Sequence, residues 1–237
     1  MTIYAGTSGW AYPEWKGSFY PADLPDGEML SWYASRLSAV EVNNTFYRMP
    51  KREVVEGWGR QVPEGFRFVL KASRRITHQA KLGPGAAEPL AYLVANAQVL
   101  EARLGAILFQ TPPWLKKDEG LLRDFVALLP PGVRGAFEFR STSWFQDDVY
   151  RILGDANQAL VVADTGDAER DPPVVATADW GYARLRSPAY GDAELVAWAE
   201  RLTGPDWTDL FVFFKHEDEA GGPALASRFL ELTGTAT

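Results

Sequence analysis

The sequence contains no cysteine and only two histidines among its 237 residues. Disulfide bonds, thiolate nucleophiles and cysteine-ligated metal sites are therefore excluded. His78 and His216 alone cannot build the several-histidine centres of metal-dependent isomerases and phosphodiesterases. A single Mg²⁺ on Glu41, Glu138 and Asp164 is still chemically allowed, although neighbouring cations disfavour it. We therefore expect no metal site and no cofactor.

Long hydrophobic runs are also missing. No apolar stretch approaches the roughly 20 residues needed to cross a bilayer, and the first residues lack the basic and apolar regions of a signal peptide. We expect a cytoplasmic protein without a membrane partner. The formal net charge of -7 disfavours broad binding to nucleic acid, because that binding depends on neutralising phosphates.

Eight short apolar runs are distributed along the whole chain. They are too continuously apolar for half-exposed strands, so they are typical of buried parallel strands. The expected strands are Thr2–Ala5, Ala39–Val42, Arg67–Leu70, Ala106–Phe109, Gly135–Phe139, Ala159–Ala163, Tyr182–Leu185 and Leu210–Phe214.

Amphipathic stretches lie between these runs, with apolar residues three and four positions apart. The expected helices are Glu28–Leu37, Ala86–Arg103, Asp118–Leu129, Asp147–Leu153, Asp192–Leu202 and Ala224–Leu232. The alternation predicts a parallel α/β fold, and without a glycine-rich phosphate loop a closed (β/α)8 TIM-type barrel is favoured over an open sheet. We expect one domain over residues 1–237, with irregular third and sixth connections. In the sixth, the polar, proline-broken segment Asp164–Val174 is typical of a loop.

Side chains able to hydrogen-bond follow every expected strand. Active sites of such barrels are built at the carboxyl ends of the strands, so these side chains are the candidates for a site. The catalytic candidates are Glu41, Lys71, His78, Glu138 and Asp164. The candidates for substrate binding are Ser8, Trp10, Tyr12, Asn43, Tyr47, Gln110, Arg140, Trp144, Arg184 and Lys215.

The pair Glu138 and Arg140 gives the sharpest geometric expectation. Residues i and i+2 of a strand emerge on one face, so both side chains should line one pocket, where Arg140 or Arg184 would bind an anion. The alternative is a closed ring of ion pairs that only stabilises the barrel mouth. The aromatic residues Trp10, Tyr12, Trp15, Tyr47 and Trp144 either form the floor and walls for a flat or sugar-like ligand or pack the loops.

Several long motifs carry a family resemblance. They are GTSGWAYPEWKGSFYP at 6–21, VEVNNTFYRMP at 40–50, FVLKASRRITH at 68–78, LGAILFQTPP at 104–113, AFEFRSTSWF at 136–145, ATADWGYARLR at 176–186 and FVFFKHEDE at 211–219. Together they resemble the YecE-like family, known as domain of unknown function 72, over nearly the whole chain. The resemblance implies a TIM-type barrel distantly similar to sugar isomerases, and it implies no established reaction. Many members carry FNN where this chain has Phe214, Lys215 and His216.

Three functions are compatible with these residues. The first is a small-molecule enzyme that performs acid–base chemistry on a sugar-like or phosphorylated substrate, with Glu138 or Glu41 as base and Lys71 or His78 as acid. Arg140 and Arg184 would hold the anionic group of that substrate. The second is a metal-dependent isomerase or phosphodiesterase. The third is a barrel that binds nucleic acid or another ligand without catalysis, through Lys71, Arg74, Arg75 and Lys81.

Overall fold

The computed structural model describes residues 1–167, 170–188, 190–215 and 220–234. Eight parallel strands pair in sequence order, and β1 also pairs with β8, so the sheet closes into a barrel. The strands are β1 (Thr2–Thr7), β2 (Ala39–Val42), β3 (Arg67–Lys71), β4 (Leu104–Gln110), β5 (Gly135–Glu138), β6 (Ala159–Ala163), β7 (Trp180–Leu185) and β8 (Asp209–Phe214). The predicted TIM-type barrel is confirmed.

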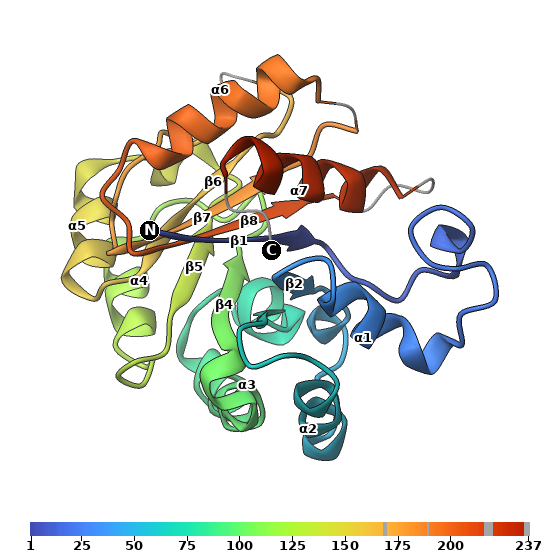
Figure 1. Cartoon of the computed structure of the whole chain (residues 1–237). Helices are drawn as coiled ribbons and strands as arrows, with labels where there is room; N and C mark the ends of the chain where they lie inside the picture. Colours follow the sequence, from blue (N-terminus) through green and yellow to red (C-terminus); the bar gives the residue numbers. More distant parts are fainter. Residues whose placement is uncertain (168–169, 189, 216–219, 235–237) are drawn as a thin grey trace.

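Helices surround the barrel, with α6 and α7 on one side of the view in Figure 1 and α2 and α3 on the other. The helices are α1 (Met29–Ala34), α2 (Arg52–Arg60), α3 (Ala87–Ala97), α4 (Glu119–Val126), α5 (Asp147–Asp155), α6 (Asp192–Thr203) and α7 (Gly221–Leu232). Asp118 caps α4 by accepting a hydrogen bond from the backbone N–H of Leu121 at 2.9 Å, which satisfies a free donor of the first turn.

Two hydrophobic cores follow from the alternation along each strand. The inner core fills the barrel with residues such as Val69, Leu108 and Phe211, and the outer core packs residues such as Val40, Phe68 and Ile107 against the helices. Both faces of each strand are therefore buried, which explains why the strands read as continuous apolar runs.

The elements differ from the expected ones mainly at their ends. The expected helix Ala86–Arg103 is α3 followed by a 3-10 segment, Gln98–Arg103, in which Glu101 has a positive φ of 51°. Helix α2 was not among the expected helices, because the two glycines in REVVEGWGR obscure its helical pattern. The described residues between β6 and β7 contain no helix, in agreement with the loop predicted over Asp164–Val174. Residues 168–169 of that segment lie outside the described residues.

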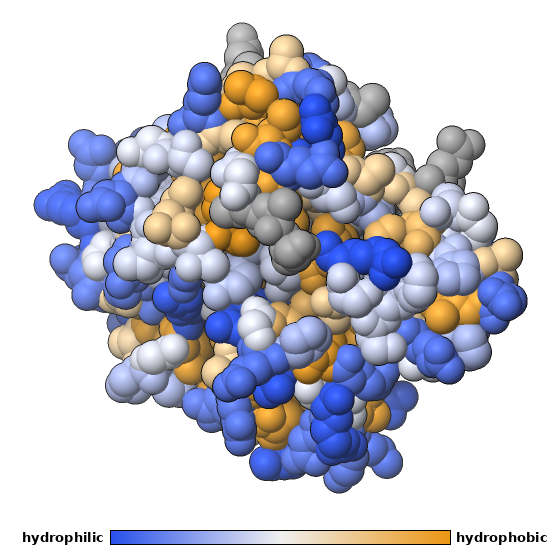
Figure 2. Space-filling model, in the orientation of Figure 1, coloured by the Kyte–Doolittle hydropathy of each residue, from blue (hydrophilic) through white to orange (hydrophobic). Residues whose placement is uncertain are grey.

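The face of the molecule that Figure 2 shows is mostly polar. In the view of Figure 2, hydrophilic residues cover most of the visible face and hydrophobic residues form separate small patches. Within the described part of the chain, no helix is both long enough and apolar enough to cross a membrane.

Candidate functional site

The barrel interior changes from apolar to polar at the carboxyl ends of the strands. Ala39, Val69 and Ala136 belong to the inner core, and two residues further along their strands are Glu41, Lys71 and Glu138. Because alternate residues share a face, these three side chains also point into the barrel. The same period places charged and polar groups together above the inner core.

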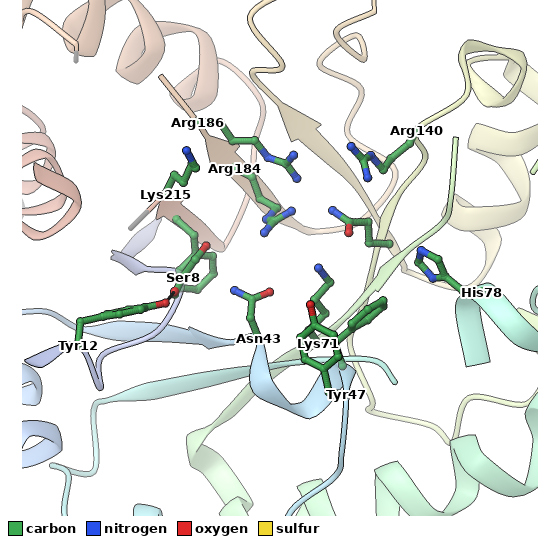
Figure 3. A pocket seen from close by; sticks show the side chains of 13 residues that line it. Ser8, Tyr12, Asn43, Tyr47, Lys71, His78, Arg140, Arg184, Arg186 and Lys215 are labelled. Carbon is green, nitrogen blue, oxygen red and sulfur yellow. Dashed lines mark hydrogen bonds between the residues drawn. The ribbon is translucent and has the colours of Figure 1, made fainter. Parts of the chain in front are cut away.

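These groups border a pocket of about 460 Å³. In Figure 3, side chains from opposite sides of the barrel, among them Arg184, Lys71 and Asn43, point toward a common centre. The pocket is lined by Ser8, Tyr12, Asn43, Phe46, Tyr47, Lys71, His78, Gln110, Arg140, Arg184, Arg186, Phe213 and Lys215. Five of these residues are lysine or arginine, and none is an acid.

Glu41 lies beneath the pocket and is fully buried. Its carboxylate accepts hydrogen bonds from Arg184 Nη2 at 2.8 Å and the Tyr182 hydroxyl at 2.6 Å. Ser8 Oγ and Asn43 Nδ2 also donate to it, each at 3.0 Å. Burial alone would raise the pKa of Glu41, but Arg184, Tyr182 and Lys71 together hold it below its ordinary value.

Glu138 is the second buried carboxylate and has 3% of its surface exposed. It accepts from Arg184 Nη1 at 2.6 Å, Arg186 Nη2 at 2.7 Å and Gln110 Nε2 at 2.9 Å. Burial opposes ionisation here too, and the two guanidinium groups outweigh it, so the pKa of Glu138 falls to about 2. Both glutamates are thus ionised and surrounded by donors, which makes them weak general bases at neutral pH.

Arg184, on β7, joins these two carboxylates. The residue is 7% exposed, and its guanidinium spans from Glu41 on β2 to Glu138 on β5. Its Nε–H has no hydrogen-bond partner among the described residues, so one buried donor beside the pocket is left unsatisfied.

Lys71 has a different environment from these ion pairs. Among the described residues its ammonium group makes no hydrogen bond and no ion pair, and Nζ lies 4.8 Å from the centre of the Phe46 ring. Burial and the positive charge of Arg184 lower the pKa of Lys71 to about 8, partly opposed by Glu41 and Glu138. The Thr45 hydroxyl donates to the Lys71 carbonyl at 2.7 Å, which ties the ends of β2 and β3 together.

His78 reaches the pocket from the segment after β3. Its ring meets Phe46 edge-on at 5.0 Å, and its Nδ1 lies 2.8 Å from the Thr77 hydroxyl. Burial and the charges of Lys71 and Arg140 lower the pKa of His78 below its ordinary value, which favours the neutral imidazole.

Ten of the fifteen predicted site residues line this pocket. Glu41 and Glu138 lie directly beneath it, where they accept hydrogen bonds from the lining residues Ser8, Gln110 and Arg184. Arg140 lines the pocket as expected from its position, but Glu138 pairs with Arg184 and Arg186 instead of Arg140. Arg140 has no ion pair in the part of the chain that the structure describes.

Asp164, Trp10 and Trp144 are not brought to the pocket. Asp164 has the opposite strand parity to Ala159 and Val161, which face the inner core, and it accepts a hydrogen bond from the Tyr190 hydroxyl away from the pocket. Trp144 is fully buried and stacks on Phe139 at 4.5 Å, on the helix side of β5.

Trp10 packs edge-on against Trp58 of α2 at 5.4 Å. Trp10 and Trp144 therefore pack loops against the core, which is the second of the two roles that the sequence allowed for them.

Arg186, Phe46 and Phe213 were missing from the predicted site. Arg186 lies just past the end of β7, two residues after Arg184, and Phe213 lies within β8, two residues before Lys215. Strand parity therefore places both on the inner face of the barrel. Phe46 comes from a 3-10 turn, Asn44–Phe46, whose direction the sequence does not reveal.

No group of three or more His, Asp or Glu side chains in the described ranges is placed to hold a metal ion. His216 lies outside the described residues. Glu41 and Glu138 are separated by the Arg184 guanidinium, so the carboxylates considered for Mg²⁺ face a cation instead of one another.

Comparison with known proteins gives a consistent result. A family model described as "Protein of unknown function DUF72" matches residues 4–237. The curated protein YunF of Bacillus subtilis is 31% identical over 62% of this chain and 54% of its own length. YecE of Escherichia coli is 38% identical over 34% of this chain and 27% of its own length. The matched regions thus span about half or less of these curated relatives.

Solved structures show the same fold. A DUF72 family protein from Thermotoga maritima superposes with a TM-score of 0.79 at 23% identity, over 99% of this chain and 100% of that chain. A fusion protein with a xylose isomerase-like TIM barrel gives 0.59 at 9% identity, over 99% of this chain and 43% of that one.

Proposed function

The chain belongs to the family of proteins of unknown function DUF72, and from this premise, which fixes a fold and no reaction, we propose that it is an enzyme acting on a small anionic metabolite. The substrate would be a phosphorylated or carboxylated, sugar-like molecule held at the carboxyl ends of the strands. Lys71 would exchange protons with it.

The observation that carries this proposal is the unequal charge of the pocket. Five cationic side chains line it, while the only carboxylates found beneath it among the described residues, Glu41 and Glu138, are engaged by Arg184 and Arg186. Arg140 and Lys71 keep charges that no described carboxylate neutralises at ion-pair distance. A ligand with a phosphate or carboxylate would supply the missing negative charge, and a guanidinium fork suits both groups.

The polar lining also suits a polyhydroxy substrate. Ser8, Asn43 and Gln110 carry hydroxyl and amide groups at the pocket wall, and Tyr47, 72% exposed, stands at its edge. A second cavity of about 390 Å³ shares Tyr47 with the first, which leaves room for a substrate longer than the pocket itself. A pocket of about 460 Å³ fits a small metabolite better than a segment of protein or nucleic acid.

The roles of the charged residues follow from their contacts. Glu41 and Glu138, expected as candidate bases, are better suited to fix Arg184 and Arg186 in place, because their oxygens are already occupied by donors. Lys71, with its pKa near 8, is suited to gain and lose a proton near neutral pH. Neutral His78 is suited to relay that proton.

Calorimetric titration with inorganic phosphate at low ionic strength tests the proposed site. Arg140→Gln should weaken binding by about tenfold or more, as expected for a charged hydrogen-bonding partner. Arg123→Gln, on the exposed face of α4, serves as the matched control and should bind as the parent does. If the parent binds no phosphate, or if both variants bind alike, the anion site is wrong.

A further inference from the structure

Lys71 differs from Lys16 and Lys117 in having no carboxylate at ion-pair distance among the described residues. Lys16 lies 2.7 Å from Asp26, and Lys117 pairs with Asp148 and Glu119. Lys71, by contrast, stands inside a pocket against the face of Phe46, with cations around it. A desolvated lysine beside other cations is the environment in which an amine becomes a nucleophile.

The protonation state of Lys71 agrees with its surroundings. A pKa of about 8 leaves roughly a quarter of the side chain as free amine at pH 7.5, against about 0.1% for an ordinary lysine. A lysine that only held an anion would gain from staying fully charged. The position of Lys71 therefore points to covalent chemistry in addition to charge.

We propose that Lys71 is a covalent site, whose amine condenses with an aldehyde or ketone that also carries a phosphate or carboxylate group. This inference rests on the proposed function, since the anion would be held by the same pocket, and it names the substrate class. Arg140, which lies above Lys71 in Figure 3 and lines the same pocket, would hold the anionic group while the carbonyl carbon meets Nζ.

The condensation balances without any further reactant. The Lys71 nitrogen forms a bond to the carbonyl carbon, the carbonyl oxygen becomes a hydroxyl, and this hydroxyl leaves as water when the C=N bond forms. Both hydrogens of that water come from the free amine. No oxidant or reductant is needed, and the imine returns to amine and carbonyl by hydrolysis.

His78 is placed to move these protons. Its ring and the Lys71 ammonium lie against the same Phe46 ring, at 5.0 Å and 4.8 Å from its centre. With Nδ1 bonded to the Thr77 hydroxyl, a neutral imidazole can accept a proton from nitrogen and return it to oxygen. Glu41 and Glu138, one layer below, supply negative charge for a protonated imine.

Reductive trapping tests the proposal on the full chain. The protein is incubated with glyceraldehyde 3-phosphate, reduced with sodium borohydride and digested for peptide mass spectrometry. The exposed Lys51 serves as the internal standard among the seven lysines. We expect Lys71 to be modified at least tenfold faster than Lys51, and inorganic phosphate to slow that reaction.

Two variants complete the experiment. Lys71→Arg keeps the charge without a condensing amine, so it should still bind phosphate within about threefold of the parent and show no adduct at residue 71. Lys81→Arg, outside the pocket lining, should label as the parent does. Thermal melting checks that both variants fold.

The outcomes separate this inference from the proposed function. If phosphate binds but Lys71 reacts no faster than Lys51, the imine is wrong and the anion site stands. If phosphate neither binds nor competes, and neutral glyceraldehyde modifies Lys71 as fast as its phosphate ester, the anion site is wrong and the covalent site stands. If phosphate does not bind and Lys71 reacts no faster than Lys51, both the anion site and the covalent site are wrong.

Discussion

Arg184 is the residue on which the floor of the pocket depends. Its two terminal nitrogens bind Glu41 and Glu138 at 2.8 and 2.6 Å, and all three side chains are buried. Removing one member of such a cluster leaves an uncompensated buried charge, which costs more than a surface ion pair contributes. The cluster therefore positions the pocket and also stabilises the barrel.

Glu138→Gln should lower the free energy of unfolding by about 3 kcal/mol at pH 7, because Arg184 and Arg186 lose their shared counter-charge. The folded pKa of Glu138, about 2, lies below its ordinary value of 4.5. Its ionisation therefore contributes stability above pH 4.5 that is lost as the pH falls toward 2, and the difference between parent and variant should shrink over this range.

Urea unfolding of both proteins from pH 7 to pH 3 measures this difference. Glu53→Gln, exposed on α2, is the control and should change stability by less than about 0.5 kcal/mol. A Glu138→Gln variant as stable as the control at pH 7 would mean that the buried cluster contributes nothing to folding.

At the scale of elements, β1 and β2 meet through a close backbone contact. Their register pairs Gly6 with Ala39, and Tyr33 of α1 donates to the Ala39 carbonyl at 3.0 Å and accepts from the Thr7 N–H at 2.8 Å. A Cβ atom on Gly6 would lie 1.8 Å from the Ala39 oxygen. Glycine is therefore required at residue 6 for these strands to close this side of the barrel.

Gly6→Ala should destabilise the protein by about 3 kcal/mol, since the clashing atom belongs to the backbone of a central strand and cannot move aside. Gly27→Ala is the matched control, because nothing lies within 4 Å of its added Cβ. Chemical denaturation of the two variants should give clearly separate midpoints. Equal midpoints would contradict the β1–β2 geometry.

The strands also explain which site residues could be predicted from the sequence and which could not. Strand parity predicts that Glu41, Lys71 and Glu138 share the barrel interior, since each is two residues beyond an inward-facing position. The same parity, applied to Asp164, would have placed it outside. The contact of Arg184 with Glu41, 143 residues apart, could not be predicted, because it depends on barrel closure and on the rotamers of long side chains.

On the scale of the whole molecule, charge is unevenly placed. The chain has a formal net charge of -7, yet the described residues that line its central pocket include five cations and no acid. An acidic surface around a cationic pocket favours small anions, which can enter, over a phosphate backbone, which must approach the surface. Sequence composition predicts the net charge, and only the fold shows where the positive charge collects.

The central claim is that Lys71 is the pocket group that titrates near neutral pH while the glutamates stay ionised. Its pKa can be measured directly from the ¹³Cε resonances of the lysines by NMR over pH 6 to 12, with the Lys71 signal assigned by its loss in Lys71→Arg. We predict a midpoint of about 8 for Lys71. A Lys71 midpoint at the ordinary lysine value of 10.5 would contradict both the proton-exchanging role and the covalent site.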